Sequence, residues 1–479
     1  MNLSQKAGQV LMPFYAGLDY EAQAARIERL HLAGSIIMGD NVPKTVDGLV
    51  DTAAMATVTK RLSGAARSDG RGWPGLIGVD QEGGEVARLG APLTEWPSPM
   101  SYGAAGSVPL ATESGRALAA ELAPLGFNVD FAPDADVTIG ASDPTIGARS
   151  MSASPDAAAK LGVGFFRGML AGGMLPAVKH FPGHGSVTVD SHEGLPVQNA
   201  TVAQLRAKDW KPFKAAVDAG APMVMTGHIA VTALEPGVPA SLSKPAYAAL
   251  RGMGFTGVAV TDALNMGAVQ KQFPNGSAAP RALAAGADLL LMPADVEQAH
   301  AAIVSAATAG TLPAARLDEA ARRVATMMIW REREHAKAAP GAAPGSGNTL
   351  STKVSAAAVT ILAGPCKGPM VPGSVRVAGG SAQDRARFEA AAQEAGVGLG
   401  TGPLVSLIGY GGRPVDGHIA VALDAPWALA GSTAPAKIAL YGRSPGAFKA
   451  LLAVLTGKAP APGNLPSAFG GFRAGAGCP

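Results

Sequence analysis

The chain has 479 residues, of which 48% are hydrophobic and only 16% are charged. Disordered chains combine low hydrophobicity with high charge, so this composition predicts a folded protein with a sizeable core. Its 39 Lys and Arg residues nearly balance its 36 Asp and Glu residues, so we expect neither a nucleic-acid partner nor a membrane surface.

Short apolar runs alternate with helical patterns from residue 7 to about residue 334. Such runs without polar alternation are typical of strands that are covered on both faces. The eight runs are Gly8–Met12, Ser35–Met38, Leu76–Asp80, Phe127–Phe131, Ala177–Phe181, Met223–His228, Gly257–Asp262 and Asp288–Met292. The main helical patterns are Glu21–Leu32, Thr45–Ser63, Ala111–Leu125, Pro155–Leu170, Val202–Ala219, Arg281–Ala285 and Pro313–Glu334.

Eight strands that alternate with helices predict an α/β protein built on a (β/α)8 TIM-like barrel. A doubly wound open sheet is the alternative. That fold would place a glycine-rich phosphate loop after its first strand, and the sequence has none there. No apolar run approaches the ~20 residues that a membrane-spanning helix needs.

A second domain is predicted after the barrel. Residues 336–347 are rich in Ala, Pro, Gly and Ser and lack apolar periodicity, as linkers do. We therefore assign residues 1–335 to the barrel, 336–350 to a linker and 351–479 to a smaller C-terminal α/β domain. The patterns in that domain predict strands at Val359–Leu362, Leu404–Ile408 and Ile419–Leu423, and helices at Asp384–Ala395 and Ser444–Leu455.

The two cysteines, Cys366 and Cys478, are too few for a disulfide scaffold or a cysteine-based zinc site. They could form one bridge, but we expect two unpaired thiols. The N-terminal sequence has no basic segment followed by an apolar one, so we expect no secretory signal and a cytoplasmic protein. Export, with the leader absent from this chain, is the alternative.

Polar residues stand at the ends of five predicted strands. In a (β/α)8 barrel the active site is built at the C-terminal ends of the strands. The strand-end residues are Asp80, Asp134 or Asp136, Lys179 and His180, His228, and Asp262. We expect them to converge at one mouth of the barrel and to form the active site.

The segment from Lys179 to His192 concentrates reactive side chains. It holds three of the eight histidines together with Lys179 and Asp190. Asp190 and His192 are close enough in sequence for the carboxylate to hydrogen-bond the imidazole, which fixes the tautomer of the ring and raises its basicity. A histidine held in this way is a candidate general acid/base.

Three motifs resemble glycoside hydrolase family 3, and in particular its β-N-acetylglucosaminidase branch. They are GVDQEGG at residues 78–84, KHFPGHG at residues 179–185 followed by DSH at 190–192, and VTDALNM at residues 260–266. The resemblance spans roughly residues 1–334. Ala263 departs from the family pattern, because many members carry a second aspartate at that position.

The resemblance implies a retaining exo-β-N-acetylglucosaminidase that removes terminal β-linked N-acetylglucosamine from peptidoglycan fragments or chitooligosaccharides. Asp262 would be the nucleophile that forms a covalent glycosyl-enzyme, and His192, partnered by Asp190, would be the acid/base. The substrate-binding positions that it implies, or that would line the same pocket, are Asp80, Arg88, Arg149, Lys179, His180, His228 and Met266. Glu82 and Asp136 are weaker candidates, and His184 is expected to brace the loop.

The resemblance implies no metal and no cofactor. In related glucosidases a second domain supplies the acid/base carboxylate, whereas here His192 already fills that role. We therefore expect the C-terminal domain to be non-catalytic.

Three other functions stay open. A β-N-acetylglucosaminide phosphorylase could use the same site, because a neutral imidazole repels phosphate less than a carboxylate would. A metal-dependent hydrolase would need clustered His and Asp at strand ends, but the first predicted strand has no His-x-His. A non-catalytic sugar-binding barrel would be consistent with Ala263.

Overall fold

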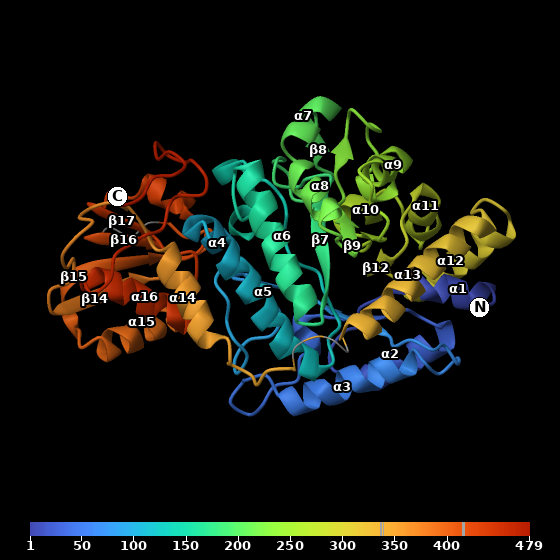
Figure 1. Ribbon diagram of the computed structural model, residues 1–479, viewed down its shortest axis with the longest axis horizontal. Coiled ribbons are helices and arrows are strands. Elements are labelled where there is room, and N and C mark those ends of the chain that lie inside the picture. Colours follow the sequence, from blue (N-terminus) through green and yellow to red (C-terminus); the bar gives the residue numbers. More distant parts are fainter. Residues whose placement is uncertain (336–337, 339, 414–416) are drawn as a thin grey trace.

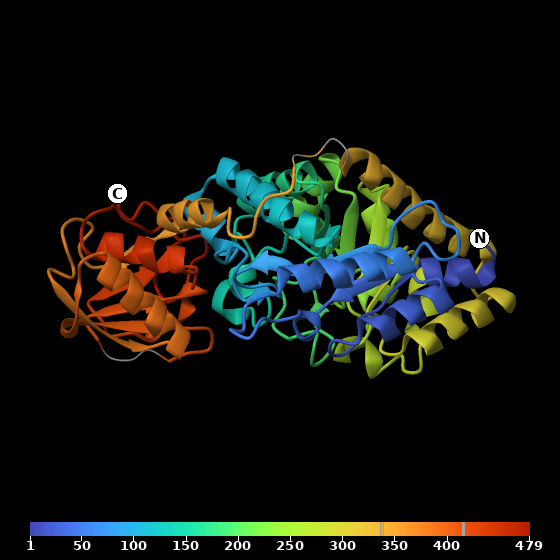
Figure 2. The ribbon, with the colours of Figure 1, turned by 90° about the horizontal axis from the view of Figure 1, so that it is seen from below.

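The computed structural model describes residues 1–335, 338, 340–413 and 417–479. Residues 336, 337 and 339 of the predicted linker lie outside the described residues. The barrel and the C-terminal domain lie side by side, with the C-terminal domain in orange and red (Figures 1 and 2).

Eight parallel strands form a barrel, as predicted. They are β1 (Leu11–Met12), β2 (Gly34–Ile37), β3 (Leu76–Val79), β6 (Val129–Asp130), β7 (Leu175–Phe181), β9 (Met223–Thr226), β11 (Val258–Thr261) and β12 (Leu290–Leu291). Six of them pair in the order β11-β9-β7-β6-β3-β2, and β12 pairs with β1. Backbone hydrogen bonds close the ring, because Thr261 N–H donates to Leu289 and Ala33 N–H donates to Leu11.

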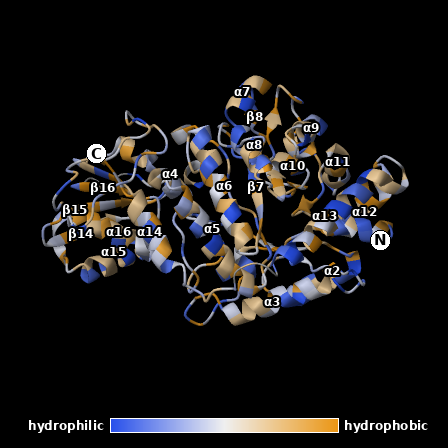
Figure 3. Cartoon of the chain, viewed as in Figure 1, coloured by the Kyte–Doolittle hydropathy of each residue, from blue (hydrophilic) through white to orange (hydrophobic). Residues whose placement is uncertain are grey.

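Helices surround the strands. They are α1 (Leu3–Gln9), α2 (Tyr20–Leu30), α3 (Thr52–Ala65), α4 (Met100–Ala105), α5 (Val108–Leu122), α6 (Pro155–Ala171), α7 (Val202–Ala207), α8 (Lys211–Asp218), α9 (Lys244–Gly252), α10 (Gly267–Gln270), α11 (Ala278–Ala285), α12 (Val296–Thr308) and α13 (Ala314–His335). Strand β7 is mostly hydrophobic apart from Lys179 and His180 near its end, whereas helices such as α2 and α12 mix hydrophilic and hydrophobic residues (Figure 3). This pattern matches strands buried on both faces and helices with one solvent face.

Several predicted boundaries are wrong for local reasons. The predicted helix Thr45–Ser63 begins only at Thr52, because Asp51 caps α3. The predicted helix Val202–Ala219 is two helices, because Trp210 is buried between them and Pro212 starts α8. The predicted strand Gly8–Met12 shrinks to β1, because α1 runs on to Gln9 from a capping box formed by Asn2 and Gln5.

Side chains fill the inside of the barrel, so it is a packed core and not a pore. Met12, Phe131, Met223 and Val260 are fully buried there. Met328 of α13 belongs to the same apolar cluster. The polar strand-end residues therefore stand on a rigid apolar floor.

The C-terminal domain is a five-stranded sheet with three helices. The strands are β13 (Thr360–Ala363), β14 (Ser374–Gly379), β15 (Gly398–Ile408), β16 (Ile419–Ala422) and β17 (Ala436–Ala439), in the order β13-β17-β16-β15-β14 with only β13 antiparallel among these pairs. The helices are α14 (Asn348–Ala358), α15 (Ala382–Glu394) and α16 (Pro445–Leu455).

The C-terminal domain packs on the barrel. Arg387 forms an ion pair with Glu95 at 2.7 Å, and Ser98 N–H donates to the Tyr441 carbonyl at 2.9 Å. The connecting chain is also held, because the Glu121 carboxylate accepts the N–H groups of Gly345 and Gly347. Helix α14 begins at Asn348, inside the predicted linker.

The expectation of unpaired thiols is wrong, because Cys366 and Cys478 form a disulfide across 112 residues of sequence. The chain after residue 462 returns alongside β13, where Gly463 N–H donates to the Val359 carbonyl. This return brings Cys478 to the segment that follows β13. No helix in the described part of the chain is long and apolar enough to cross a membrane.

Candidate active site

The predicted strand-end residues meet around one cavity of about 360 Å³. Eight of the ten predicted site residues line it: Asp80, Arg88, Arg149, Lys179, His180, His192, Asp262 and Met266. A larger hollow of about 640 Å³ lies at the other end of the barrel, where the strands begin, and contains none of them. The reactive side chains therefore identify the smaller cavity as the candidate site.

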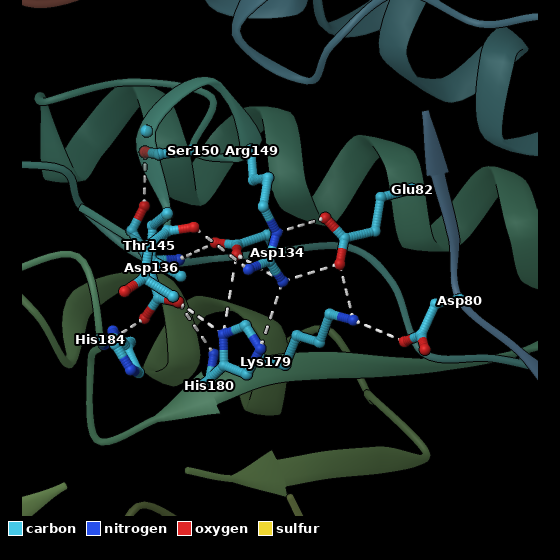
Figure 4. Close-up of polar contacts among 12 residues, drawn as sticks. Asp80, Glu82, Asp134, Asp136, Thr145, Arg149, Ser150, Lys179, His180 and His184 are labelled. Carbon is cyan, nitrogen blue, oxygen red and sulfur yellow. Dashed lines mark hydrogen bonds and ion pairs between the residues drawn. The ribbon is translucent and has the colours of Figure 1, made fainter. Parts of the chain in front are cut away.

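A network of ion pairs forms one wall of the cavity (Figure 4). Lys179, which projects from β7, lies 3.0 Å from Asp80 and 2.7 Å from Glu82. Arg149 donates hydrogen bonds to both carboxylate oxygens of Glu82, from Nε to Oε2 at 3.0 Å and from Nη2 to Oε1 at 2.9 Å. Arg88 Nη2 reaches the second oxygen of Asp80 at 3.3 Å.

Glu82 is the hub of this wall. Burial of the Glu82 carboxyl opposes its ionisation, but Arg149 and Lys179 outweigh burial and hold its pKa well below the usual range. The sequence motif marked Glu82 only weakly, yet its carboxylate positions two cations that line the cavity. Fixed cations and carboxylates of this kind can bind the hydroxyl groups of a sugar.

His180 is paired with two aspartates behind the network. Its Nδ1 lies 2.8 Å from Asp136 and 3.6 Å from Asp134. Burial lowers the pKa of His180 to about 4 and raises the pKa of Asp136 to about 7, so the imidazole is neutral at pH 7.

Among the described residues, Asp134, Asp136 and His180 are spaced closely enough to hold a metal ion, because one ligand atom from each lies within 4.8 Å of the others. Two features do not fit a metal centre. The Nδ1 atom of His180 is already engaged by Asp136, and the Arg149 guanidinium lies 3.7 Å from Asp134. A cation placed there would meet a fixed positive charge.

Asp262 follows β11 and faces the cavity. One of its oxygens accepts the N–H of Ala263 at 2.8 Å. Burial opposes ionisation, but His228, His180, this N–H and Lys179 outweigh it and lower the pKa of Asp262 to about 2. Asp262 is therefore a carboxylate at neutral pH, as a nucleophile requires.

His228 is not among the residues that line the cavity, so the structure does not place it where the sequence predicted. The imidazole is fully buried and lies 2.6 Å from the Ser241 hydroxyl and 2.8 Å from the Ala263 carbonyl oxygen. Both ring nitrogens are used for these bonds, so the ring supports the backbone beside Asp262.

The predicted acid/base pair is present. Asp190 lies 2.7 Å from His192 Nδ1 and also accepts the His192 N–H at 2.9 Å. Burial raises the pKa of Asp190, but these bonds outweigh it and the pKa falls below its usual value. Because Asp190 holds Nδ1, Nε2 is the nitrogen available to a substrate, and the His192 side chain is 63% exposed.

The loop that carries His192 is docked on the start of α10, five residues after Asp262. Gly267 N–H donates to the His192 carbonyl at 3.2 Å, and Ala268 N–H donates to the Ser191 carbonyl at 3.3 Å. A β-carbon at residue 267 would lie 2.6 Å from the His192 carbonyl oxygen, so the close approach requires glycine. Sequence reasoning missed Gly267, because nothing local marks it.

His184 braces the same loop, as expected. Its Nε2 lies 2.8 Å from the Ser191 hydroxyl, and its backbone N–H donates to Asp136 at 2.6 Å. Burial lowers the pKa of His184 to about 3, so the ring stays neutral.

Methionines form much of the apolar lining. Met38, Met225, Met266 and Met292 all line the cavity, and Met292 has a φ of +47°. A left-handed conformation costs a non-glycine residue about 1–3 kcal/mol. Of these four, the sequence pointed only to Met266, because the others stand in ordinary strand-end positions.

Comparisons with known proteins agree with this geometry. The family described as "Glycosyl hydrolase family 3 N terminal domain" matches residues 2–327. The structure of a glycoside hydrolase family 3 β-N-acetylglucosaminidase from Paenibacillus sp. str. FPU-7 superposes with a TM-score of 0.87 at 28% identity, over 98% of this chain and 99% of that one.

Two curated relatives are β-hexosaminidases. β-Hexosaminidase A of Pseudoalteromonas piscicida is 36% identical over 286 residues, which is 56% of this chain but only 46% of the relative. β-Hexosaminidase LpqI of Mycobacterium tuberculosis is 32% identical over 337 residues, which is 67% of this chain and 81% of the relative. With a family match over most of the chain and a cavity built from the family's motifs, this chain belongs to glycoside hydrolase family 3 and is a glycoside hydrolase.

Proposed function

We propose that the protein is a retaining exo-β-N-acetylglucosaminidase. The observation that carries the proposal is that Asp262, which is ionised, and His192, which is bonded to Asp190, line the same cavity. The first is a carboxylate nucleophile and the second is a general acid/base, which are the two groups that a retaining glycosidase needs.

In the first step Asp262 attacks the anomeric carbon while His192 Nε2 gives its proton to the leaving oxygen. The C–O bond to the leaving group breaks as the glycosyl–Asp262 bond forms. In the second step neutral His192 takes a proton from water, which attacks the anomeric carbon and releases Asp262. Asp190 stays ionised and stabilises the His192 imidazolium, which is present before the first step and after the second.

We propose terminal β-linked N-acetylglucosamine as the sugar that is removed, from peptidoglycan fragments or chitooligosaccharides. The names of the similar β-hexosaminidases and of the similar β-N-acetylglucosaminidase support this substrate class. The wall of Asp80, Arg88 and Lys179 provides donors and acceptors for the hydroxyl groups of the sugar.

A time course with an aryl N-acetyl-β-glucosaminide tests the proposal. We expect near-total loss of activity for Asp262→Ala. His192→Ala should lose less with a good leaving group, because such a group departs without protonation. Asp218→Asn, which removes a surface carboxylate of α8, is a control and should match the wild type. Equal activity in Asp262→Ala and wild type would contradict the mechanism.

The same time course with added phosphate tests the alternative of phosphorolysis. We expect free N-acetylglucosamine as the main product with or without phosphate. N-acetylglucosamine 1-phosphate as the main product would overturn hydrolysis in favour of a phosphorylase. Binding of sugar without turnover of any glycoside would favour the non-catalytic alternative, and loss of activity on chelation would favour the metal-dependent one.

The sequence predicts a cytoplasmic location, with export as the alternative. We propose export. The Cys366–Cys478 bridge supports export, because disulfides persist in oxidising compartments and are rare in the cytosol. Thiol labelling after fractionation of the source cells tests this. A cytoplasmic protein with two reduced thiols would contradict it.

A further inference from the structure

A second cavity, of about 390 Å³, lies where the barrel meets the C-terminal domain. The barrel contributes Glu85 and Trp96 to its lining, and the C-terminal domain contributes Tyr410, Asp424 and Arg443. We call it the interdomain cavity. It is similar in volume to the catalytic cavity, and no step of the mechanism above uses it.

The two cavities lie on opposite faces of one hairpin. Strands β4 (Gln81–Gly83) and β5 (Val86–Ala87) pair antiparallel directly after Asp80, which lines the catalytic cavity. Glu82, Val86 and Arg88 line the catalytic cavity, whereas Gln81, Glu85 and Ala87 line the interdomain cavity. This division follows from the strand geometry, because successive side chains point to opposite faces.

The interdomain cavity carries an excess of negative charge. The Arg443 guanidinium pairs with Asp424 in the lining at 2.5 Å and with Asp384, which is buried behind the lining, at 3.3 Å, so these three side chains keep one net negative charge. Glu95 is neutralised by Arg387. Glu85 has no hydrogen bond or ion pair with any residue that the structure describes, so its carboxyl is free to take a partner of opposite charge.

Glu85 is also in an unfavourable position for a charge. The residue as a whole is exposed, but its carboxyl is partly enclosed by the cavity. This enclosure and the neighbouring Asp424 raise the pKa of Glu85 to about 7, although Arg149 and Arg443 oppose the shift. A bound cation would relieve this repulsion.

Tyr410 gives the cavity an aromatic wall. Its hydroxyl donates to the Pro144 carbonyl at 2.9 Å and its N–H donates to Asp424 at 3.1 Å, while the residue stays 60% exposed. Pro144 belongs to the loop that leads to Arg149. The aromatic ring is therefore fixed against the barrel but accessible, and a ring face of this kind attracts cations and packs against apolar groups.

We propose that the interdomain cavity is a second binding site, for an amino sugar that carries a free ammonium group. The ammonium would pair with Glu85 and Asp424, and the sugar ring would pack on Tyr410. The choice of a sugar rests on the proposed function, whereas the choice of a cation rests on the charge of the cavity. The C-terminal domain thereby acquires a role in binding, although it supplies no catalytic group.

Calorimetry with glucosamine tests the site. The titration is made in saturating N-acetylglucosamine, which occupies the catalytic cavity. We expect glucosamine to bind the wild type and to bind Glu85→Gln about tenfold or more weakly, because a charged hydrogen bond is lost. Glucose, which lacks the amine, should not bind. Glu113→Gln, which removes an exposed carboxylate of α5, is the matched control and should bind like the wild type.

Equal glucosamine affinity in wild type and Glu85→Gln would overturn the proposal, and so would equal binding of glucose. Tyr410→Ala provides a second variant, which we expect to bind glucosamine more weakly than the wild type while its melting temperature stays unchanged. Hydrolysis of an aryl N-acetyl-β-glucosaminide by Glu85→Gln is measured in parallel. Wild-type hydrolysis with lost glucosamine binding supports the second site, whereas absent hydrolysis by the wild type would refute the proposed function separately.

The amino sugar could be free or part of a partly de-N-acetylated chain, and KM separates the two. For a chain that reaches both cavities, Glu85→Gln raises KM for partly de-N-acetylated chitooligosaccharides but not for the aryl glycoside. For a free amino sugar, both KM values stay unchanged while glucosamine binding is lost.

Discussion

Replacing Gly267 by alanine tests how the loop of His192, the proposed acid/base, is held near Asp262, the proposed nucleophile. The N–H groups of Gly267 and Ala268 donate to the carbonyls of His192 and Ser191 at 3.2 and 3.3 Å. An added β-carbon would lie 2.6 Å from the His192 oxygen and 3.2 Å from the Glu193 oxygen. Because these are backbone atoms, a side-chain rotation cannot relieve the contact, and the loop must move away from α10.

The size of the effect follows from the two bonds. Each backbone hydrogen bond contributes about 0.5–1.5 kcal/mol, so losing both destabilises the docked loop by about 2 kcal/mol. Since 1.4 kcal/mol is a factor of ten, the docked population can fall by up to about 30-fold. We expect kcat/KM for poor leaving groups to fall about 10- to 30-fold, which is less than the 10²–10⁴ that general acid catalysis contributes in full.

The assay compares kcat/KM across aryl N-acetyl-β-glucosaminides whose leaving groups differ in pKa. The dependence on leaving-group pKa should be steeper for Gly267→Ala than for the wild type, because proton donation by His192 is impaired. Gly194→Ala is the matched control in the same loop, where a β-carbon would meet only the Val189 side chain, at 3.9 Å. Equal dependence in wild type and Gly267→Ala would refute the reasoning. An equal loss for every leaving group would also refute it.

Two further predictions concern the C-terminal bridge and the nucleophile. Reducing Cys366–Cys478 opens a closed loop of about 100 residues, which lowers the free energy of unfolding by about 4–5 kcal/mol in the chain-entropy model. Thermal unfolding with and without reductant measures this loss, and an unchanged Tm would contradict the prediction. A carboxyl with a lowered pKa stays ionised above that value, so with Asp262 at about 2, inactivation of His192→Ala by an activated 2-fluoro glycoside should be constant from about pH 4 to pH 7. The pKa of His180 is about 4 and that of Asp136 is about 7, so the range of about pH 5 to pH 6 is diagnostic. A rate that falls within that range would show that Asp262 titrates higher.

The barrel was predictable because its strands are buried on both faces. Such strands appear in the sequence as apolar runs without polar alternation, as at Leu76–Val79, and five of the eight runs lead to a polar residue near their ends. Helix limits were less accurate, because they depend on capping and tertiary contacts. The buried Trp210, for example, interrupts a helical pattern that is continuous in sequence.

The C-terminal domain was less predictable for a different reason. Strands β14 (Ser374–Gly379) and β17 (Ala436–Ala439) escaped prediction, and β14 carries glycine and arginine in place of an apolar run. The disulfide depends on a tail that returns to β13 from 112 residues away, and sequence spacing holds no information about such a return.

Within the site, sequence predicted which residues approach the mouth but not what each one faces. A strand end fixes where a side chain begins, whereas the turn that follows fixes its direction. His228 and Asp262 both follow barrel strands, yet the imidazole of His228 turns to the Ala263 carbonyl and Asp262 turns to the cavity. The ring nevertheless affects the proposed nucleophile, because it bonds to the next residue in the chain and lowers the pKa of Asp262. A buried histidine beside a catalytic aspartate is thus better interpreted as a support for the backbone than as a second contact to the sugar.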